Sequence, residues 1–98
     1  MTNEKESRPL FELGRVVATP GALRVFQDTN ADICAYIRRH HFGDWGDLDL
    51  EDQEANTAAL VHGTRILSAY KVPPSDEKIW IITEADRSAT TVLTPEEY

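Results

Sequence analysis

Cysteine is nearly absent from the sequence: Cys34 is the single one among 98 residues. One cysteine excludes an internal disulfide and a zinc site built from cysteines. Long apolar runs are also lacking, because no stretch approaches the roughly 18 residues of a membrane-spanning helix and residues 1–10 contain no signal-peptide core. There is no glycine-rich phosphate loop, internal repeat or low-complexity tract. We therefore expect a cytoplasmic protein with a flexible N-terminus over residues 1–10 and a single domain over residues 11–98.

Basic residues are outnumbered, with 10 Lys and Arg against 17 Asp and Glu and a formal net charge of −7. This balance argues against nonspecific binding to nucleic acid or to an anionic membrane surface. The acids are unevenly distributed, because the segment DWGDLDLEDQE, residues 44–54, contains no base. Such a segment is either a solvated loop leading into a helix N-terminus, where carboxylates are favourable, or a surface that binds a basic partner.

The order of helix-like and strand-like segments indicates an α+β fold. Thr19-Pro20 is typical of a helix start, and Thr94-Pro95 repeats this signature near the end of the sequence. In chain order we expect a strand over residues 13–19, helices from 20 to about 30, from 31 to about 41 and from 49 to 62, and strands over 64–72, 78–83 and 89–93. The predicted fold is two or three helices packed on one face of a three- to four-stranded, mainly antiparallel sheet, in the order β-α-α-α-β-β-β.

Periodicity also predicts parts of the core. Trp80 lies in the nearly continuous apolar run KIWIIT, which is typical of a central strand and predicts a buried ring. Cys34, beside Ile33 on a predicted helix, is expected to be a small buried side chain. The helix over residues 49–62 has a face of small residues that would allow close packing, formed by Ala55, Ala58, Ala59 and His62.

Histidines and polar residues in two parts of the chain are the candidates for catalysis. His40 and His41 end a predicted helix, and Arg87, Thr90 and Thr91 follow a turn and the next strand. In a small nuclease, a histidine would act as general acid or base, the arginine would hold a phosphate and the threonines would orient the substrate. The ordinary alternative is a histidine that completes an apolar helix face, an arginine that pairs locally and threonines that form strand. The spacing of the histidines and nearby aspartates matches no metal signature, and we expect no metal or cofactor.

Trp45 stands between two glycines inside the acidic segment. A tryptophan surrounded by carboxylates either caps the core or anchors a partner protein. We expect a protein-binding surface here, with no direct nucleic-acid or membrane contact. Its predicted members are Trp45, Asp44, Asp47, Asp49, Glu51 and Asp52, of which Asp49 and Asp52 also resemble a weak helix-capping pair.

Four segments of the sequence resemble a known family. LGRVVATPGAL, HHFGDWGDL, RILSAYKV and KIWIITEADRSATTVLTPEEY look like a small uncharacterised bacterial family described as plasmid-related. The resemblance covers roughly residues 11–98, and the sequence departs from it mainly between Val25 and Ile37. Because the family is scattered on plasmids, integrated elements and phage-like regions, the resemblance implies a mobile genetic element as the context and no particular chemistry.

Three hypotheses for function follow. The preferred one is a non-enzymatic protein-interaction module of a mobile genetic element, which binds a host or element protein through its acidic surface in a counter-defence or regulatory role. The alternative is a small RNase-like toxin or nuclease with the His/Arg/Thr site, whose helices-then-strands order is loosely similar to ribonuclease-type toxins. The third is a structural subunit that oligomerises through the exposed side of the sheet containing KIWIIT.

Overall fold

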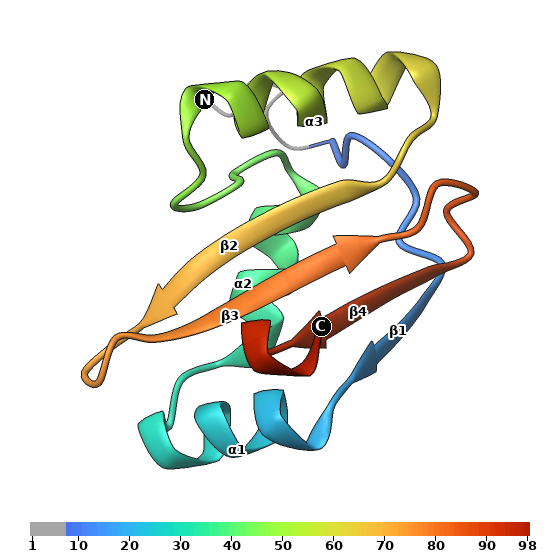
Figure 1. Ribbon diagram of the computed structural model, residues 1–98. Coiled ribbons are helices and arrows are strands. Elements are labelled where there is room, and N and C mark those ends of the chain that lie inside the picture. Colours follow the sequence, from blue (N-terminus) through green and yellow to red (C-terminus); the bar gives the residue numbers. More distant parts are fainter. Residues whose placement is uncertain (1–7) are drawn as a thin grey trace, which may run out of the picture.

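The computed structural model describes residues 8–98 (Figure 1). Within these residues the α+β prediction and its element order are confirmed, and no helix has the length and apolar character needed to cross a membrane. Most of the predicted flexible N-terminus, residues 1–7, lies outside the described residues. In chain order the elements are β1 (Arg15–Ala18), α1 (Pro20–Thr29), α2 (Ile33–His41), α3 (Leu50–His62), β2 (Ile66–Val72), β3 (Glu77–Thr83), β4 (Ala89–Leu93) and the 3-10 helix η1 (Pro95–Glu97).

The strands form one mixed sheet in the order β1-β4-β3-β2. β2, β3 and β4 form the expected antiparallel meander. β1 pairs in parallel with β4, from Arg15 opposite Ala89 to Ala18 opposite Val92. A parallel pair needs a long crossover, which the three helices and two strands between β1 and β4 supply. β1 and β2 are therefore the two edges of the sheet.

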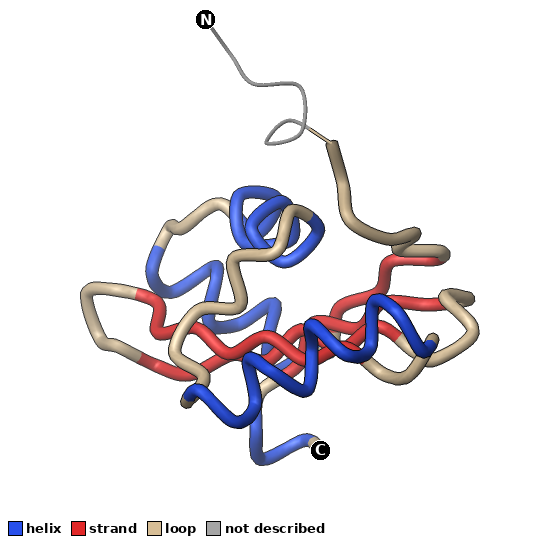
Figure 2. Tube along the Cα trace, turned by 90° about the horizontal axis from the view of Figure 1, so that it is seen from above, coloured by secondary structure: helices blue, strands red, loops and turns tan. Residues whose placement is uncertain are grey.

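Helices α1 and α2 cover one face of the sheet, α3 lies along the β2 edge, and η1 lies on the opposite face (Figure 1 and Figure 2). Successive strand residues point to opposite faces, and in β2 every second residue from Ile66 to Val72 is buried. The apolar core lies between the sheet and α1 and α2. Its buried members are Ala22, Val25, Phe26, Tyr70, Val72, Ile79, Ile81 and Val92.

Local sequence explains where the helices begin and end. Pro20 is the first residue of α1, and the Thr19 hydroxyl oxygen accepts a hydrogen bond at this helix start, as the Thr-Pro signature predicts. The Asp49 carboxylate caps α3 by accepting the N–H of Asp52 at 2.9 Å. Gly63 ends α3 in the left-handed conformation, with φ of 73°, which glycine adopts without steric cost. Each signal lies directly at the helix end that it marks, so it can be recognised in the sequence.

Hydrogen bonds cover the outer edge of β2. The Asn56 side chain on α3 donates to the Leu67 carbonyl at 2.6 Å and accepts the Leu67 N–H at 3.1 Å. Farther along the strand, Ala69 donates its N–H to the Trp45 carbonyl at 3.1 Å and accepts the N–H of Asp47 at 2.7 Å. An edge whose N–H and C=O groups are satisfied in this way no longer templates another strand.

Two core predictions are wrong in detail. Cys34 is exposed rather than buried, because the side of α2 that packs on the core carries Ile33, Tyr36 and Ile37. Trp80 is half-buried on the sheet face opposite α1 and α2. That face is covered only in part, by η1 and the residue after it (Figure 1).

The buried face of α3 also differs from the prediction. Of the expected small-residue face only Ala59 is buried, while Ala55, Ala58 and His62 are exposed. The second buried residue of α3 is Asn56. The physical reason is the position of the helix at a sheet edge, where a polar side chain that bonds the strand backbone is favoured over a purely apolar contact.

Candidate functional site

A chain of buried polar groups links α2 to the middle of the sheet. His40 Nδ1 lies 2.5 Å from Ser68 Oγ on β2, and Nε2 lies 2.9 Å from Thr83 Oγ1 on β3. Thr83 Oγ1 lies 2.7 Å from Thr90 Oγ1 on β4, and the Thr90 hydroxyl donates to the Leu13 carbonyl at 2.7 Å. The chain therefore joins a helix, three neighbouring strands and the segment that precedes β1.

The carbonyl at the end of this chain determines the direction of every hydrogen bond in it. A carbonyl oxygen only accepts, so the single hydroxyl hydrogen of Thr90 is used on Leu13, and Thr90 Oγ1 accepts from Thr83. Thr83 Oγ1 then accepts from Nε2–H of His40. Because Nε2 carries the hydrogen of the neutral ring, Nδ1 carries none and accepts from the Ser68 hydroxyl. His40 is therefore the Nε2–H tautomer.

The environment of His40 keeps the imidazole neutral. The side chain is fully buried, and burial, with a smaller effect of the neighbouring His41, lowers its pKa to about 3. Ser68, which would be the nucleophile of a serine–histidine pair, is fully buried as well. A general base has to reach a proton of the substrate, directly or through one water. The geometry of His40 instead suits a structural role, the attachment of α2 to the sheet.

The Arg87 guanidinium is surrounded by backbone carbonyls. Nη1 donates to the carbonyls of Thr64, Glu84 and Ala85 at 2.7, 3.1 and 3.2 Å. Nη2 donates to the Ala59 carbonyl near the end of α3 at 3.1 Å. Arg87 itself adopts a φ of 60° in the turn between β3 and β4. Its side chain therefore joins this turn to the end of α3, and its donors are directed to the peptide chain.

His41 and Arg87 both lie against the ring of Phe11. The centroid of the Phe11 ring is 5.8 Å from the His41 ring centroid and 5.9 Å from the Arg87 guanidinium carbon. Nε2 of His41 lies 2.9 Å from the Phe11 carbonyl, to which it donates. Both side chains thus fasten the segment before β1, and the polar contacts of both go to backbone carbonyls.

The two threonines on β4 face opposite ways. Thr90 is buried within the chain that contains His40, and Thr91 points to the other face of the sheet. The structure therefore brings together two pairs of the predicted catalytic set: His40 and Thr90, linked through Thr83, and His41 and Arg87, which both contact Phe11. The first pair lies in the interior of the protein, and the polar contacts of the second go to backbone carbonyls.

Two hollows on the surface, of about 610 and 360 Å³, are lined by other residues. The larger lies beside α1 and η1 and contains Arg24 and Glu97, and the smaller lies over β2 and β3 and contains Lys78 and Trp80. None of the five candidate catalytic residues lines either hollow. Among residues 8–98, no group of three or more His, Cys, Asp and Glu side chains is arranged to hold a metal ion.

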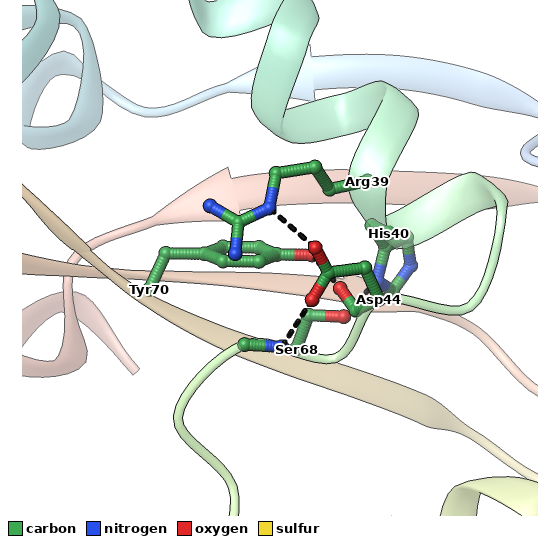
Figure 3. Close-up of polar contacts among 6 residues, drawn as sticks. Arg39, His40, Asp44, Ser68 and Tyr70 are labelled. Carbon is green, nitrogen blue, oxygen red and sulfur yellow. Dashed lines mark hydrogen bonds and ion pairs between the residues drawn. The ribbon is translucent and has the colours of Figure 1, made fainter.

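Asp44, at the start of the acidic segment, is part of a structural corner. Its carboxylate accepts from Arg39 Nε at 2.7 Å and from the Gly46 N–H at 3.2 Å (Figure 3). The hydrogen bond from Arg39 is the main reason that the pKa of Asp44 is lowered. The Arg39 guanidinium lies 4.6 Å from the centroid of the Tyr70 ring, whose hydroxyl donates to the Asp44 carbonyl at 2.6 Å. These contacts attach the acidic segment to α2 and β2.

Trp45 makes the contacts of a core cap. The ring is half-buried and stacks on Phe11, with centroids 6.2 Å apart and an interplanar angle of 28°. Its edge meets His40 at a centroid distance of 6.0 Å. Of the two roles predicted for Trp45, closing the core is the one that these contacts support.

The remaining acidic residues of the segment are exposed at the start of α3. Glu51 and Asp52 lie in the first turn, where they face the positive end of the helix dipole, and Asp49 is the capping residue. Among residues 8–98, the structure shows no salt bridge to any of them. We use the name acidic surface for Asp47, Asp49, Leu50, Glu51, Asp52 and Glu54, which are all exposed.

Leu50 is the member of this surface that sequence reasoning missed. Its side chain is 75% exposed in the midst of the carboxylates. A signal was present, because Leu50 and Val61 are three helical turns apart on one side of α3, and Val61 is exposed as well. The predicted buried face of this helix drew attention to the alanines instead.

Comparisons of the chain with protein-family models, with curated proteins and with solved structures found no match.

Proposed function

We propose that this chain is a non-enzymatic interaction module that binds a basic protein surface through the acidic surface at the start of α3. We also propose that the partner is a protein of a host cell or of a mobile genetic element, met in the cytoplasm, with a counter-defence or regulatory outcome. This second statement rests on the resemblance of residues 11–98 to plasmid-related proteins.

One observation carries the proposal: an exposed leucine surrounded by carboxylates that have no cationic partner among residues 8–98. An apolar side chain that is desolvated on binding supplies affinity, and the charges around it supply selectivity and a fast association rate. Leu50 is 75% exposed, and Asp47, Glu51, Asp52 and Glu54 are exposed beside it. Fixed carboxylates of this kind can compete with nucleic acid for a basic groove.

The alternative of an RNase-like enzyme has less support. It needs a histidine that reaches the substrate and an arginine with donors directed to a phosphate. His40 is fully buried, Nε2 of the partly buried His41 donates to the Phe11 carbonyl, and Arg87 donates to four backbone carbonyls. We therefore do not propose catalysis.

The test compares proteins captured from a lysate of the host cell by three forms of the chain. The first is the wild type, and the second is the fourfold variant D47N/E51Q/D52N/E54Q, which leaves the Asp49 cap and the Asp44–Arg39 pair in place. The third is the matched control D28N/E77Q/E84Q/E96Q, which removes as many exposed carboxylates elsewhere. We expect at least one basic protein to be captured by the wild type and the control, to be lost with the fourfold variant, and to dissociate as salt is raised.

Leu50→Ser tests the apolar part separately. We expect it to weaken binding of the captured protein by about tenfold, the equivalent of about 1.4 kcal/mol, whereas Val61→Ser on the same helix leaves binding unchanged. If no captured protein depends on the four carboxylates, or if the control variant loses the same proteins, the proposal is wrong.

A further inference from the structure

The two edges of the sheet differ in how their backbone groups are used. On β2, Asn56 and the loop before α3 satisfy the outward groups of Leu67 and Ala69. On β1, Arg15 and Thr19 donate their N–H groups to carbonyls of β4 and its turn, each at 2.9 Å. Alternate residues of an edge strand point in opposite directions. The N–H and C=O groups of Val16 and Ala18 therefore point away from the sheet, and no residue from 8 to 98 forms a ladder on that side.

The side chains along this edge are apolar and exposed. Val16 and Val17 are 43% and 41% exposed, on opposite faces of β1. The usual protections of an edge strand are short length, charged side chains, proline, a bulge, an inward-pointing charge or a covering element. β1 is four residues long, with Arg15 at its start and Pro20 two positions after its end, but Val16–Ala18 themselves carry no charge or proline and no residue from 8 to 98 pairs with their outer side. An edge that is open and apolar is a pairing site for another strand.

We propose that β1 pairs in antiparallel fashion with β1 of a second copy of this chain, which joins the two sheets across a two-fold axis. A second copy is the occupant that the geometry selects. Its β2 edge is covered at Leu67 and Ala69 and carries a lysine, Lys71, at the next outward position, so β1 is the edge that it can offer. A strand that meets itself about a two-fold axis is always antiparallel and presents the same residues from both sides.

The directions of the backbone groups set the register. Val16 and Ala18 have the outward N–H and C=O groups, so Val16 of one copy pairs with the second copy's Ala18, and the reverse pair follows by symmetry. Val17 then lies on the axis opposite the second copy's Val17, as a non-hydrogen-bonded pair whose side chains are close. Contacts between β-branched side chains at such positions are favourable.

Charge complementarity supports the same register. Arg15 falls opposite the second copy's Thr19, on the face that carries η1. The Thr19 hydroxyl donates to the Glu97 carboxylate at 2.6 Å, and Glu97 also accepts the Gly21 N–H at 3.0 Å. Arg15 of each copy therefore approaches Glu97 of the other. Pairing buries the exposed valines and adds two arginine–carboxylate contacts.

Sedimentation equilibrium over a range of concentrations up to about 1 mM tests the proposal, since weak dimers with millimolar dissociation constants are detected there. We expect reversible dimers of the wild type. Val17→Lys puts two ammonium groups on the axis and should raise the dissociation constant at least tenfold. The matched control is Val61→Lys, the same change at an exposed valine on α3, which should leave dimerisation unchanged.

Amide hydrogen exchange supplies a readout at the residues themselves. In the wild type, the amides of Val16 and Ala18 should become protected from exchange as the protein concentration rises. In Val17→Lys they should remain unprotected. The midpoint of thermal denaturation of Val17→Lys should match that of Val61→Lys, which shows that the variant is folded. The proposal is overturned if the wild type is monomeric at every concentration, if Val17→Lys dimerises equally well, or if an unrelated extended peptide protects these amides while a second copy does not.

Discussion

His40 donates from Nε2 to the Thr83 hydroxyl oxygen across 2.9 Å, in the interior of the protein. This bond connects α2 to β3. Its direction is imposed at the other end of the buried series of hydrogen bonds, where the Thr90 hydroxyl donates to the Leu13 carbonyl. A residue type that suggested catalysis is thereby used to hold the fold together.

Replacement of His40 by leucine should destabilise the protein by about 2–4 kcal/mol. The Ser68 hydroxyl and the Thr83 oxygen would each lose a partner in a buried site, and a buried polar group without a partner costs about 1–3 kcal/mol. Urea denaturation measures the change. His62→Leu, at an exposed position on α3, is the control and should change stability by no more than about 0.5 kcal/mol. An equally small effect for His40→Leu would contradict the structural role.

The stability of the protein should fall as pH is lowered from about 6.5 towards 3. The pKa of His40 is about 3 in the folded protein, against 6.5 for an unperturbed histidine. In this window the unfolded state binds a proton that the folded state does not, so the contribution of the neutral ring is complete above pH 6.5 and is lost on acidification. Denaturation at several pH values gives the slope of the free energy of unfolding against pH. Between pH 3 and 6.5 this slope should be steeper in the wild type than in His40→Leu, by up to about 1.4 kcal/mol per pH unit. Equal slopes would show that His40 titrates normally.

Adjacent threonines on β4 should respond differently to the same substitution. Thr90→Val leaves the Leu13 carbonyl without a donor and the Thr83 hydroxyl without an acceptor, at an expected cost of about 1–3 kcal/mol. Thr91→Val, on the opposite face of the sheet, removes none of the buried hydrogen bonds that link His40 to Leu13, and it should change stability by less than about 0.5 kcal/mol. Thermal denaturation of the pair distinguishes the buried chain from a general effect of strand propensity.

A lysine at position 87 should not be able to take over the stabilising contacts of Arg87. A lysine has one ammonium group, whereas both terminal nitrogens of Arg87 donate to carbonyls in different directions. We expect Arg87→Lys to destabilise the protein by about 1–3 kcal/mol. Arg24→Lys, on the exposed side of α1, is the control with little change. A residue that held only a phosphate would tolerate the change without loss of stability, and that result would reopen the enzyme hypothesis.

Removal of the Asn56 side chain should expose part of the β2 edge. Asn56→Ala leaves the N–H and C=O of Leu67 without their partners, and we expect a cost of about 1–3 kcal/mol and faster amide exchange at Leu67. Thr57→Ala, at the next and exposed position, serves for comparison. Unchanged exchange at Leu67 would mean that Asn56 does not cover this edge.

Local signals explain how much of the fold could be predicted. Thr19-Pro20, Asp49 and Gly63 each act within a turn of the helix that they begin or end, so the order of elements followed from the sequence. The parallel pairing of β1 with β4 did not, because it joins Val16 to Thr90 across most of the chain, and nothing local to either strand records its neighbour.

In the candidate site, too, the residue types could be predicted from the sequence and their long-range partners could not. His40 was identified as a candidate from residue type, but its partners Ser68 and Thr83 lie 28 and 43 positions away, and only the folded sheet brings them together. For Arg87 the sequence leaves a phosphate site and local pairing both open, and the structure shows local pairing with backbone carbonyls that the sequence does not reveal. The acidic surface could be predicted as a run of charge. The helical spacing of Leu50 and Val61 places both on one side of α3, but only the structure shows that this side faces away from β2.

An NMR titration of the labelled protein with the basic protein that it captures from the lysate tests directly whether this chain binds through its acidic surface. We expect the amide signals of residues 47–54 to shift most, with one of the largest shifts at Leu50, and we expect these shifts to be lost in D47N/E51Q/D52N/E54Q. Shifts centred instead on the turn at Arg87 or on β4, with residues 47–54 unaffected, would contradict binding through this surface.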